Sequence, residues 1–374
     1  MDRQLLTLLQ KDIPLVSRPF EAIGKKIGLD GAETILKIQR LKTEKIIRQI
    51  SAIFDTKSLG YKSTLVAMRF PEDQLDRGAA VINQHPGVSH NYRRSHDFNL
   101  WFTIAVPPSD SLEEHIQRLH EMSGAEKTLI LPTLKLFKIG VKLDLTGKES
   151  KQENADEIYD ERRRRKAAPD LTPLEIEVIR VLQEDFPLTD EPYQFLARQA
   201  GMTESQLFET VRSFLARGYL RRFAAILHHR QAGFAANAMV VWQIPEEKQD
   251  DIGAQMALFR EVSHCYKRPV YPEFRYSLYT MIHAPKVADC EKVAERIEEK
   301  IGKWPRYSLL STKEYKKIRL KYFTKELDEW RESSSPVSSP HAFPPKFVDG
   351  SAFFVAESGD PGSADSRFRG NDKV

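Results

Sequence analysis

The sequence predicts an α+β protein of two tandem units, each a winged helix-turn-helix followed by a ferredoxin-like βαββαβ domain. The main observation is a repeated phrase, because His90-Asn91-Tyr92-Arg93-Arg94 returns half a chain later as His264-Cys265-Tyr266-Lys267-Arg268. A second repeat lies upstream, at residues 48–61 and 221–234. Around these phrases, strand-type and helix-type patterns follow in the same order in both halves, which indicates an internal duplication.

The composition is that of an ordinary soluble protein with room for several domains. Of 374 residues, 41% are apolar and 29% charged, and the net charge of +4 does not mark a nucleic-acid binder. Cys265 and Cys290 are the only cysteines, so neither a disulfide framework nor a Cys-x-x-Cys metal site is expected. No apolar run reaches the ~18 residues of a membrane span. Since residues 1–4 also lack a signal-peptide pattern, we expect a cytoplasmic protein.

Three helices are expected at the start of each unit. Their ranges are 5–10, 20–27 and a helix after Asp30 in the first unit, and 173–185, 191–200 and 204–217 in the second. Thr203 with Gln206 predicts a capping box for the last of these helices, and Gly218 ends it before a strand. This order predicts winged helix-turn-helix modules at residues 1–61 and 171–234.

A sheet unit follows each helical module, at residues 62–147 and 235–325. Each contains a strand-type run, a helix, the His-x-Tyr-x-Arg strand, another strand, an amphipathic helix and a last strand. The charged stretch 148–170 between the units contains Arg162–Lys166, and it is interpreted as a solvated linker or a patch that attracts nucleic acid or substrate. Residues 333–374 are rich in Ser, Pro and Gly, which predicts a disordered tail.

Helix-turn-helix modules usually predict DNA binding, and the start of the recognition helix tests that prediction. A DNA reader carries Arg, Lys, Asn, Gln or Ser there. Here the helices begin with Ala32-Glu33-Thr34 and Glu204-Ser205-Gln206-Leu207, whose carboxylates would be repelled by phosphates. We therefore expect modules kept for packing or dimerisation, and no nucleic-acid partner.

The repeated strands carry the candidate site. Residues two apart on a strand share a face, so His90, Tyr92 and Arg94 should point one way. The counterparts on the second strand are His264, Tyr266 and Arg268. A base, a phenol and a fixed cation on one face indicate a site that binds an anion and transfers a proton.

The two copies are not expected to be equivalent. The first continues on the same face to His96, whereas the second inserts Pro269–Phe274, whose prolines predict a loop around Tyr271. Only the second half has a wing rich in basic residues, namely Arg221, Arg222, His228 and His229. No Walker loop, zinc-protease, serine-hydrolase or dinucleotide motif is present.

Residues 88–107 and 262–285, with the repeats upstream of them, resemble the two subunit types of sirohaem decarboxylase, here in one chain. The likeness covers residues 5–323, and that family is itself similar to the Lrp/AsnC regulators, which share this domain layout. The resemblance implies a carboxy-lyase that removes the C12 and C18 acetate carboxyl groups of sirohaem as CO2. The product would be 12,18-didecarboxysirohaem, an intermediate of haem or haem d1 biosynthesis.

On this hypothesis, Arg and Lys side chains bind the carboxylates of sirohaem, and a His or Tyr protonates the methylene left by CO2. His90 and His264 are each a candidate proton donor or axial iron ligand, and His264 is the named metal-ligand candidate. Tyr92 and Tyr266 are the other catalytic candidates. The expected substrate-binding residues are Arg48, Arg93, Arg94, His96, Arg221, Arg222, His229, Lys267, Arg268 and Tyr271. No cofactor is expected beyond the iron tetrapyrrole substrate.

Two other functions stay open, an Lrp/AsnC-like transcription regulator and a tetrapyrrole sensor or carrier without turnover. The two halves are expected to pair their sheets about a pseudo-two-fold axis. The sequence leaves open whether one site or two are active, which pathway the step serves, and whether chains form a homo-oligomer.

Overall fold

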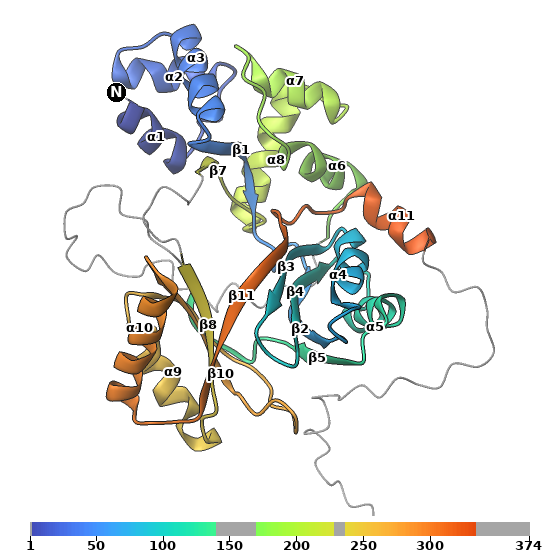
Figure 1. The fold of residues 1–374 in the computed structure, drawn as a ribbon. Helices are drawn as coiled ribbons and strands as arrows, with labels where there is room; N and C mark the ends of the chain where they lie inside the picture. Colours follow the sequence, from blue (N-terminus) through green and yellow to red (C-terminus); the bar gives the residue numbers. More distant parts are fainter. Residues whose placement is uncertain (1, 140–169, 228–235, 334–374) are drawn as a thin grey trace, which may run out of the picture.

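A computed structural model describes residues 2–139, 170–227 and 236–333 of the chain (Figure 1). The helical modules contain α1 (Asp2–Lys11), α2 (Pro19–Gly24), α3 (Gly31–Thr43) and β1 (Ile47–Phe54), then α6 (Pro173–Leu182), α7 (Pro192–Gln199), α8 (Glu204–Arg217) and β7 (Leu220–Leu227). The three helices expected in each unit are therefore confirmed. The linker 148–170 and the tail 333–374 lie almost wholly outside the described residues.

Local capping signals fix where the recognition helices begin. The Asp30 carboxylate accepts from the Glu33 N–H at 2.7 Å, and the Glu33 carboxylate accepts from the Asp30 N–H at 3.0 Å. Thr203 and Gln206 form the same reciprocal box at α8. Each box satisfies backbone N–H groups that a helix N-terminus leaves unpaired. Gly218 ends α8 at φ 74°, a conformation that glycine adopts without strain.

The two helical modules share one core at the top of the molecule in Figure 1. Its buried side chains come from both modules, for example Phe20 and Ile38 from the first and Tyr193 and Phe214 from the second. β1 and β7 pair antiparallel as a two-stranded sheet. The strands expected as wings therefore join the two halves of the chain.

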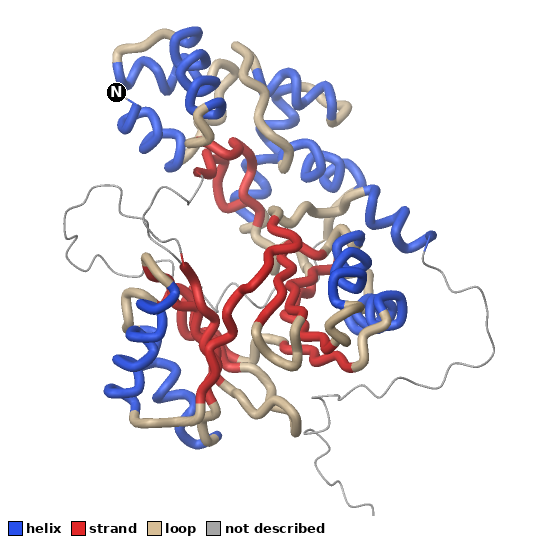
Figure 2. Tube along the Cα trace, viewed as in Figure 1, coloured by secondary structure: helices blue, strands red, loops and turns tan. Residues whose placement is uncertain are grey.

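Both sheet units have the expected order of elements. In both, the helices lie on one side of the strands (Figure 2). The first consists of β2 (Lys62–Arg69), α4 (Leu75–Gln84), β3 (Val88–Arg94), β4 (Leu100–Val106), α5 (Leu112–Ser123) and β5 (Lys127–Leu131). The second consists of β8 (Ala236–Trp242), α9 (Gln249–Ala257), β9 (Val262–Lys267), β10 (Leu278–Ala284), α10 (Val287–Ile301) and β11 (Arg306–Lys317). The strand orders β5-β2-β4-β3 and β11-β8-β10-β9 match each other and the ferredoxin-like pattern.

Each unit also adds a strand to the edge of the other. The first part of β11 pairs with β8 of its own unit, and Ser311–Lys317 then pair with β3 of the first unit. After β5, a short connection leads to β6 (Lys135–Ile139), which pairs with β9 of the second unit. The two units thus form one nine-stranded sheet, as the expected pairing of the halves requires.

The sheet has two differently filled faces. On one face, α4 and α5 cover the first unit and α9 and α10 cover the second, each over an apolar core of its own. On the other face the two units meet, and residues such as Trp101, Met239, Phe274 and Tyr279 form a shared apolar cluster. The repeated strands lie beside this shared layer.

A helix that the sequence analysis did not predict, α11 (Lys325–Ser333), follows β11. Its Trp330 packs against His85 and His115 on the helix-covered side of the first unit, with ring centroids 4.3 and 5.0 Å away. Over the described part of the chain, no helix combines the length and the apolar character needed to cross a membrane.

Candidate active site

Alternation along β3 places three of the predicted residues on one face. The Asn91 amide points to α4 and donates to Asn83 at 3.0 Å. On the opposite face the rings of His90 and Tyr92 lie 6.3 Å apart, and the Arg94 guanidinium lies 5.5 Å from the centre of the Tyr92 ring. His90, Tyr92 and Arg94, here called the first cluster, therefore lie together between the two units.

The same arrangement recurs on β9. Cys265 points to α9, with its sulfur 3.6 Å from the carbonyl oxygen of Gly253. The rings of His264 and Tyr266 lie 6.0 Å apart, and the Arg268 guanidinium lies 4.8 Å from the centre of the Tyr266 ring. His264, Tyr266 and Arg268 are the second cluster.

The two arginines are buried and reach across to the other unit. Arg94 donates to the carbonyl oxygen of Leu309 at 2.8 Å, and Arg268 donates to that of Leu131. Burial lowers the pKa of Arg94 to about 10 and also lowers the pKa of Arg268, because water no longer solvates the charge. Both Nε atoms lack a hydrogen-bond partner, and no described carboxylate acts on either guanidinium. Each arginine is therefore a buried cation suited to an anionic ligand.

Burial keeps the histidines of both clusters neutral near pH 7. It lowers the pKa of His90, and it lowers the pKa of His264 to about 4. The hydroxyls of Ser89 and Ser263 lie 3.0 and 2.8 Å from Nδ1 of the following histidine. Nε2 of each ring is thereby left for a ligand or for proton transfer.

A further histidine stands beside the second cluster. Met281 of β10 lies opposite His264, and His283 follows two residues later on the same face. After burial, His283 is the charge that most lowers the pKa of His264. The sequence analysis missed His283, although its alternation with Tyr279 and Met281 was a signal that could have identified it.

Charged side chains stand beside the first cluster. Glu314 of β11 lies opposite Tyr92, and Lys317 lies opposite His90. Burial and the Glu314 carboxylate, which accepts a hydrogen bond from the phenol, raise the pKa of Tyr92 to about 12. Lys317 and Arg48 help to lower the pKa of His90. Arg48 of β1 is therefore close to the first cluster, as expected of a residue reaching in from the wing.

Two predicted ligand residues lie on the other face of the sheet. Arg93 pairs with Glu72, and the Lys267 ammonium lies 3.7 Å from the Asp250 carboxylate on the α9 side. They do not lie on the face of Arg94 and Arg268, because neighbouring strand residues point to opposite faces. Their assignment as substrate-binding residues stays a prediction.

The remaining predicted residues are spread over other surroundings. His96 packs edge-on against Phe274 and Tyr307 at 5.2 and 5.1 Å, and the Tyr271 hydroxyl donates to the carbonyl of Ile130. These contacts build the boundary between the units, and the Pro269–Phe274 insertion is a loop, as expected. In the wings, Arg221 binds Asp55 at 2.6 Å and Arg222 lies opposite Ile53 on β7. His228 and His229 lie outside the described residues.

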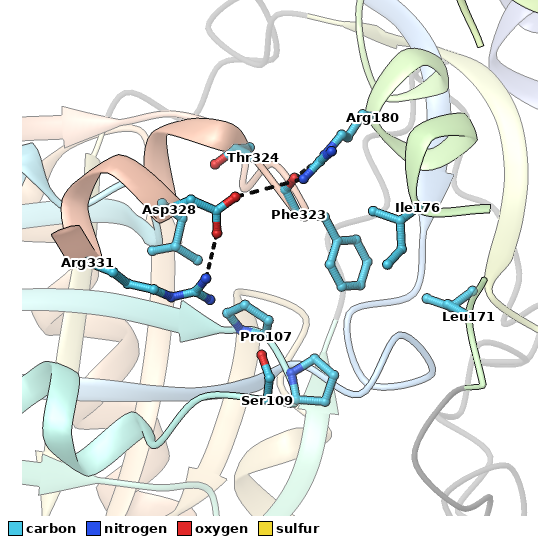
Figure 3. A pocket seen from close by; sticks show the side chains of 11 residues that line it. Pro107, Ser109, Leu171, Ile176, Arg180, Phe323, Thr324, Asp328 and Arg331 are labelled. Carbon is cyan, nitrogen blue, oxygen red and sulfur yellow. Dashed lines mark hydrogen bonds and ion pairs between the residues drawn. The ribbon is translucent and has the colours of Figure 1, made fainter. Parts of the chain in front are cut away.

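A cavity of about 260 Å³ lies away from both clusters, between α6, α11 and the connection from β4 to α5 (Figure 3). Phe323, Ile176 and Pro107 line it, and Arg180, Asp328 and Arg331 form a chain of polar contacts along one side. Among the described side chains, no group of three or more His, Cys, Asp or Glu could hold a metal ion. No histidine or tyrosine lines this cavity, so the predicted His and Tyr candidates lie elsewhere.

Comparison with known proteins agrees with this domain layout. A family model described as "Siroheme decarboxylase NirDL-like HTH domain" matches residues 2–48 and 175–221. A second, described as "AsnC-like ligand binding domain", matches residues 58–138 and 231–316. Both models match once in each unit, so the duplication seen in the sequence is confirmed.

Curated relatives match the chain as a whole and in halves. The "Siroheme decarboxylase" of Hydrogenobacter thermophilus is 39% identical over 331 residues, which cover 87% of this chain and 96% of the relative. The "Siroheme decarboxylase alpha subunit" of Desulfovibrio desulfuricans is 42% identical over 38% of this chain and 81% of its own length. The "Siroheme decarboxylase beta subunit" of Methanosarcina barkeri is 39% identical over 38% of this chain and 94% of its own length.

Solved structures match over most of the fold. The crystal structure of the siroheme decarboxylase NirDL has a TM-score of 0.71 and 34% identity, and it covers 89% of this chain and 97% of its own. The structure of NirDL with an iron-uroporphyrin III analogue matches equally well, with a TM-score of 0.71 and 33% identity over the same shares. With this identity over nearly its whole described length, the chain belongs to the siroheme decarboxylase family, in the form that joins both subunit types in one polypeptide.

Proposed function

We propose that the chain decarboxylates sirohaem, releasing the C12 and C18 acetate carboxyl groups as CO2 and giving 12,18-didecarboxysirohaem. The observation that carries the proposal is a half-buried His and Tyr with a buried Arg on one face of a strand, an arrangement found in each unit. The names of the relatives support the reaction, and the iron-uroporphyrin analogue bound by NirDL supports an iron tetrapyrrole as ligand.

Substrate binding would use the buried arginines. Sirohaem carries carboxylates around its whole ring, and a guanidinium can hold a carboxylate with two parallel hydrogen bonds. Arg94 and Arg268 have no described carboxylate partner, so an incoming carboxylate would supply the missing counter-charge. Desolvation makes that attraction stronger than at the surface.

The reaction would then need a proton at a defined place. When the bond to CO2 breaks, its electron pair stays on the methylene carbon, and the conjugated macrocycle delocalises it. A proton delivered to that carbon completes the methyl group. Burial raises the pKa of Tyr266 and Tyr92, so both phenols are protonated near pH 7 and can donate. His264, neutral down to about pH 4, suits the axial place on the substrate iron.

The test is anaerobic incubation of the purified chain with sirohaem, followed by mass spectrometry. Two successive losses of one CO2 support the proposal. Binding without any mass change would make the chain a tetrapyrrole sensor or carrier. In the variants His264→Ala and His90→Ala, at least one of the two CO2 losses should be slower than in the wild type. Wild-type rates of CO2 release in both variants would reject the acid–base assignment. A specific DNA complex with steep salt dependence would favour the regulator alternative.

A further inference from the structure

Two histidines of the first unit form a buried pair that belongs to neither cluster. His85 lies at the end of α4 and His115 lies on α5, on the helix-covered side of the sheet. Nε2 of His85 lies 2.8 Å from Nδ1 of His115. At the two ends of the pair, the Gly87 N–H donates to Nδ1 of His85 at 2.9 Å, and Nε2 of His115 lies 3.0 Å from the Asp110 carboxylate. All four ring nitrogens therefore have a partner.

The backbone donor at one end fixes the direction of each hydrogen bond in this row. Because the Gly87 N–H can only donate, Nδ1 of His85 accepts, and the proton of the neutral ring lies on Nε2. Nδ1 of His115 then accepts from His85, and Nε2 of His115 donates to Asp110. An added proton would have to go to one of the two Nδ1 atoms, where an N–H group already points at it. Protonation of either ring therefore breaks a hydrogen bond of the row.

Trp330 of α11 covers both rings. Its indole stacks on His115 with the ring centroids 5.0 Å apart, and it meets His85 edge-on at 4.3 Å. The Arg118 guanidinium of α5 lies 5.1 Å from the centre of the indole ring, and Trp330 is only 6% exposed. A charged imidazole needs water or a new acceptor in place of the broken hydrogen bond, and the indole occupies the position next to both rings.

The surroundings also favour the neutral form of the pair. Burial, and after it the His115 ring, lower the pKa of His85 well below its ordinary value. Burial lowers the pKa of His115 as well, although Asp110 opposes this shift. Cations from three elements further lower the pKa of His85, namely Lys316 of β11, Arg331 of α11 and Arg118 of α5. The pair should therefore bind a proton more readily when α11 is away than when it is docked.

Other contacts make α11 a strap between the second helical module and the first unit. On the side of α6, Arg180 donates to the carbonyl of Phe323 and lies 4.0 Å from Asp328 (Figure 3). On the side of the first unit, Arg331 donates to Asp110 at 2.6 and 2.9 Å. The carboxylate that ends the histidine row is thus also an anchor of α11.

We propose that α11 is a proton-operated latch, docked on the first unit while His85 and His115 are neutral and released when the pair takes up a proton. Because the docked state lowers the pKa of both rings, its advantage is complete above the ordinary histidine pKa of about 6.5 and is lost as the pH falls below it. Release would uncover Trp330 and the rings beneath it. The latch makes no use of the two clusters, so it does not depend on the proposed function.

Hydrogen exchange of the full chain, followed by mass spectrometry at about pH 7.5 and about pH 5, tests the latch. After correction for the pH dependence of chemical exchange, residues 325–333 should exchange about tenfold faster or more at the lower pH, whereas α10 should keep its protection. The double variant His85→Gln with His115→Gln cannot take up the proton and should exchange equally at both pH values. His120→Gln, on the same helix as His115, is the matched control and should keep the wild-type rise.

Lys316→Met gives a second test that leaves both histidines in place. The Lys316 ammonium donates to the carbonyls of Asn83 and His85 at 2.7 and 3.0 Å. Removal of this cation raises the pKa of His85, so the rise in exchange should begin at a higher pH than in the wild type. Equal protection of α11 at both pH values in the wild type would overturn the inference. The wild-type rise in the double variant, or no upward shift in Lys316→Met, would also overturn it.

Discussion

Burial of the Arg268 guanidinium is energetically unfavourable, because its hydrogen-bond partner is a backbone carbonyl and no described carboxylate pairs with it. An uncompensated charge in a low-dielectric interior costs folding free energy. Such a residue adds little to stability, and binding of an anion gives a reason for its presence. Arg306 offers a comparison within the same unit, since Glu291 and Glu298 lie 2.6 and 3.1 Å from its guanidinium.

We expect Arg268→Met to leave the free energy of unfolding within about 1 kcal/mol of wild type, because the lost hydrogen bond is offset by relief of the buried charge. The same variant should lose about tenfold or more in affinity for iron uroporphyrin III. Urea unfolding and ligand titration measure the two effects. The control Arg306→Met should lose about 1 to 2 kcal/mol, because it removes the ion pair with the mostly buried Glu298 and the more exposed pair with Glu291. An equal loss of stability in both variants would make Arg268 a structural residue.

His264 predicts a pH dependence of stability. Its folded pKa of about 4 lies below the ordinary value of 6.5, so on acidification the unfolded chain takes up the proton first. The contribution of His264 is complete above pH 6.5 and is lost as the pH falls toward 4. Between pH 7 and 4, wild type should lose about 2 to 3 kcal/mol more than His264→Gln. Urea unfolding across this range measures it, with Tyr266→Phe as a control that keeps the wild-type profile. Parallel profiles for wild type and His264→Gln would contradict the assignment.

The site residues that could be grouped from the sequence are those whose side-chain direction follows from their position along a single strand. Alternation put Tyr92 with His90 and Tyr266 with His264, because the period of a strand is local information. Glu314 escaped notice because its neighbour Tyr92 lies far back in the chain, and local periodicity does not encode the register of distant strands. The roles of these residues in catalysis remain a prediction.

At the scale of elements, helix-capping residues and the repeated order of strands and helices were the sequence features that predicted the structure correctly. Capping boxes at Asp30 and Thr203 marked the starts of α3 and α8. β6 was missed because it has only five residues, and α11 because its sequence is mainly charged. Both gain their stability from tertiary contacts, β6 from pairing with β9 and α11 from Trp330.

Trp330→Ala should therefore detach α11 and lower the free energy of unfolding by about 3 kcal/mol, because the indole is a large buried side chain. Glu329→Ala, on the exposed side of the same helix, should stay within about 0.5 kcal/mol of wild type. Urea unfolding compares the two variants. Affinity for iron uroporphyrin III should be unchanged in both, since α11 packs on the helix-covered face. A fall in affinity for Trp330→Ala alone would mean that α11 acts on the ligand site.

Across the whole molecule, three contact regions hold the halves together. The wing strands pair, the nine-stranded sheet crosses from one unit to the other at two places, and the face between the units is a shared apolar cluster. The relatives named as alpha and beta subunits each correspond to 38% of this chain. We therefore expect the two halves to stay in contact without the peptide link between the units.

A protease site inserted at residues 148–166 tests this independence from the link. After cleavage, the two pieces should elute together on size exclusion at neutral pH and bind iron uroporphyrin III as the intact chain does. Their separation should require denaturant, because the interface includes main-chain hydrogen bonds and a buried apolar layer. Pieces that part spontaneously would show that the link supplies the association.

The exchange of end strands between the units has a consequence for how such a protein is supplied in the cell. A half made alone would leave β3 or β9 as a bare edge, and unpaired edges recruit strands from other chains. Two separate genes would have to be expressed in closely matched amounts to avoid halves without a partner. A single reading frame removes that need, because every ribosome that finishes the chain releases one copy of each half.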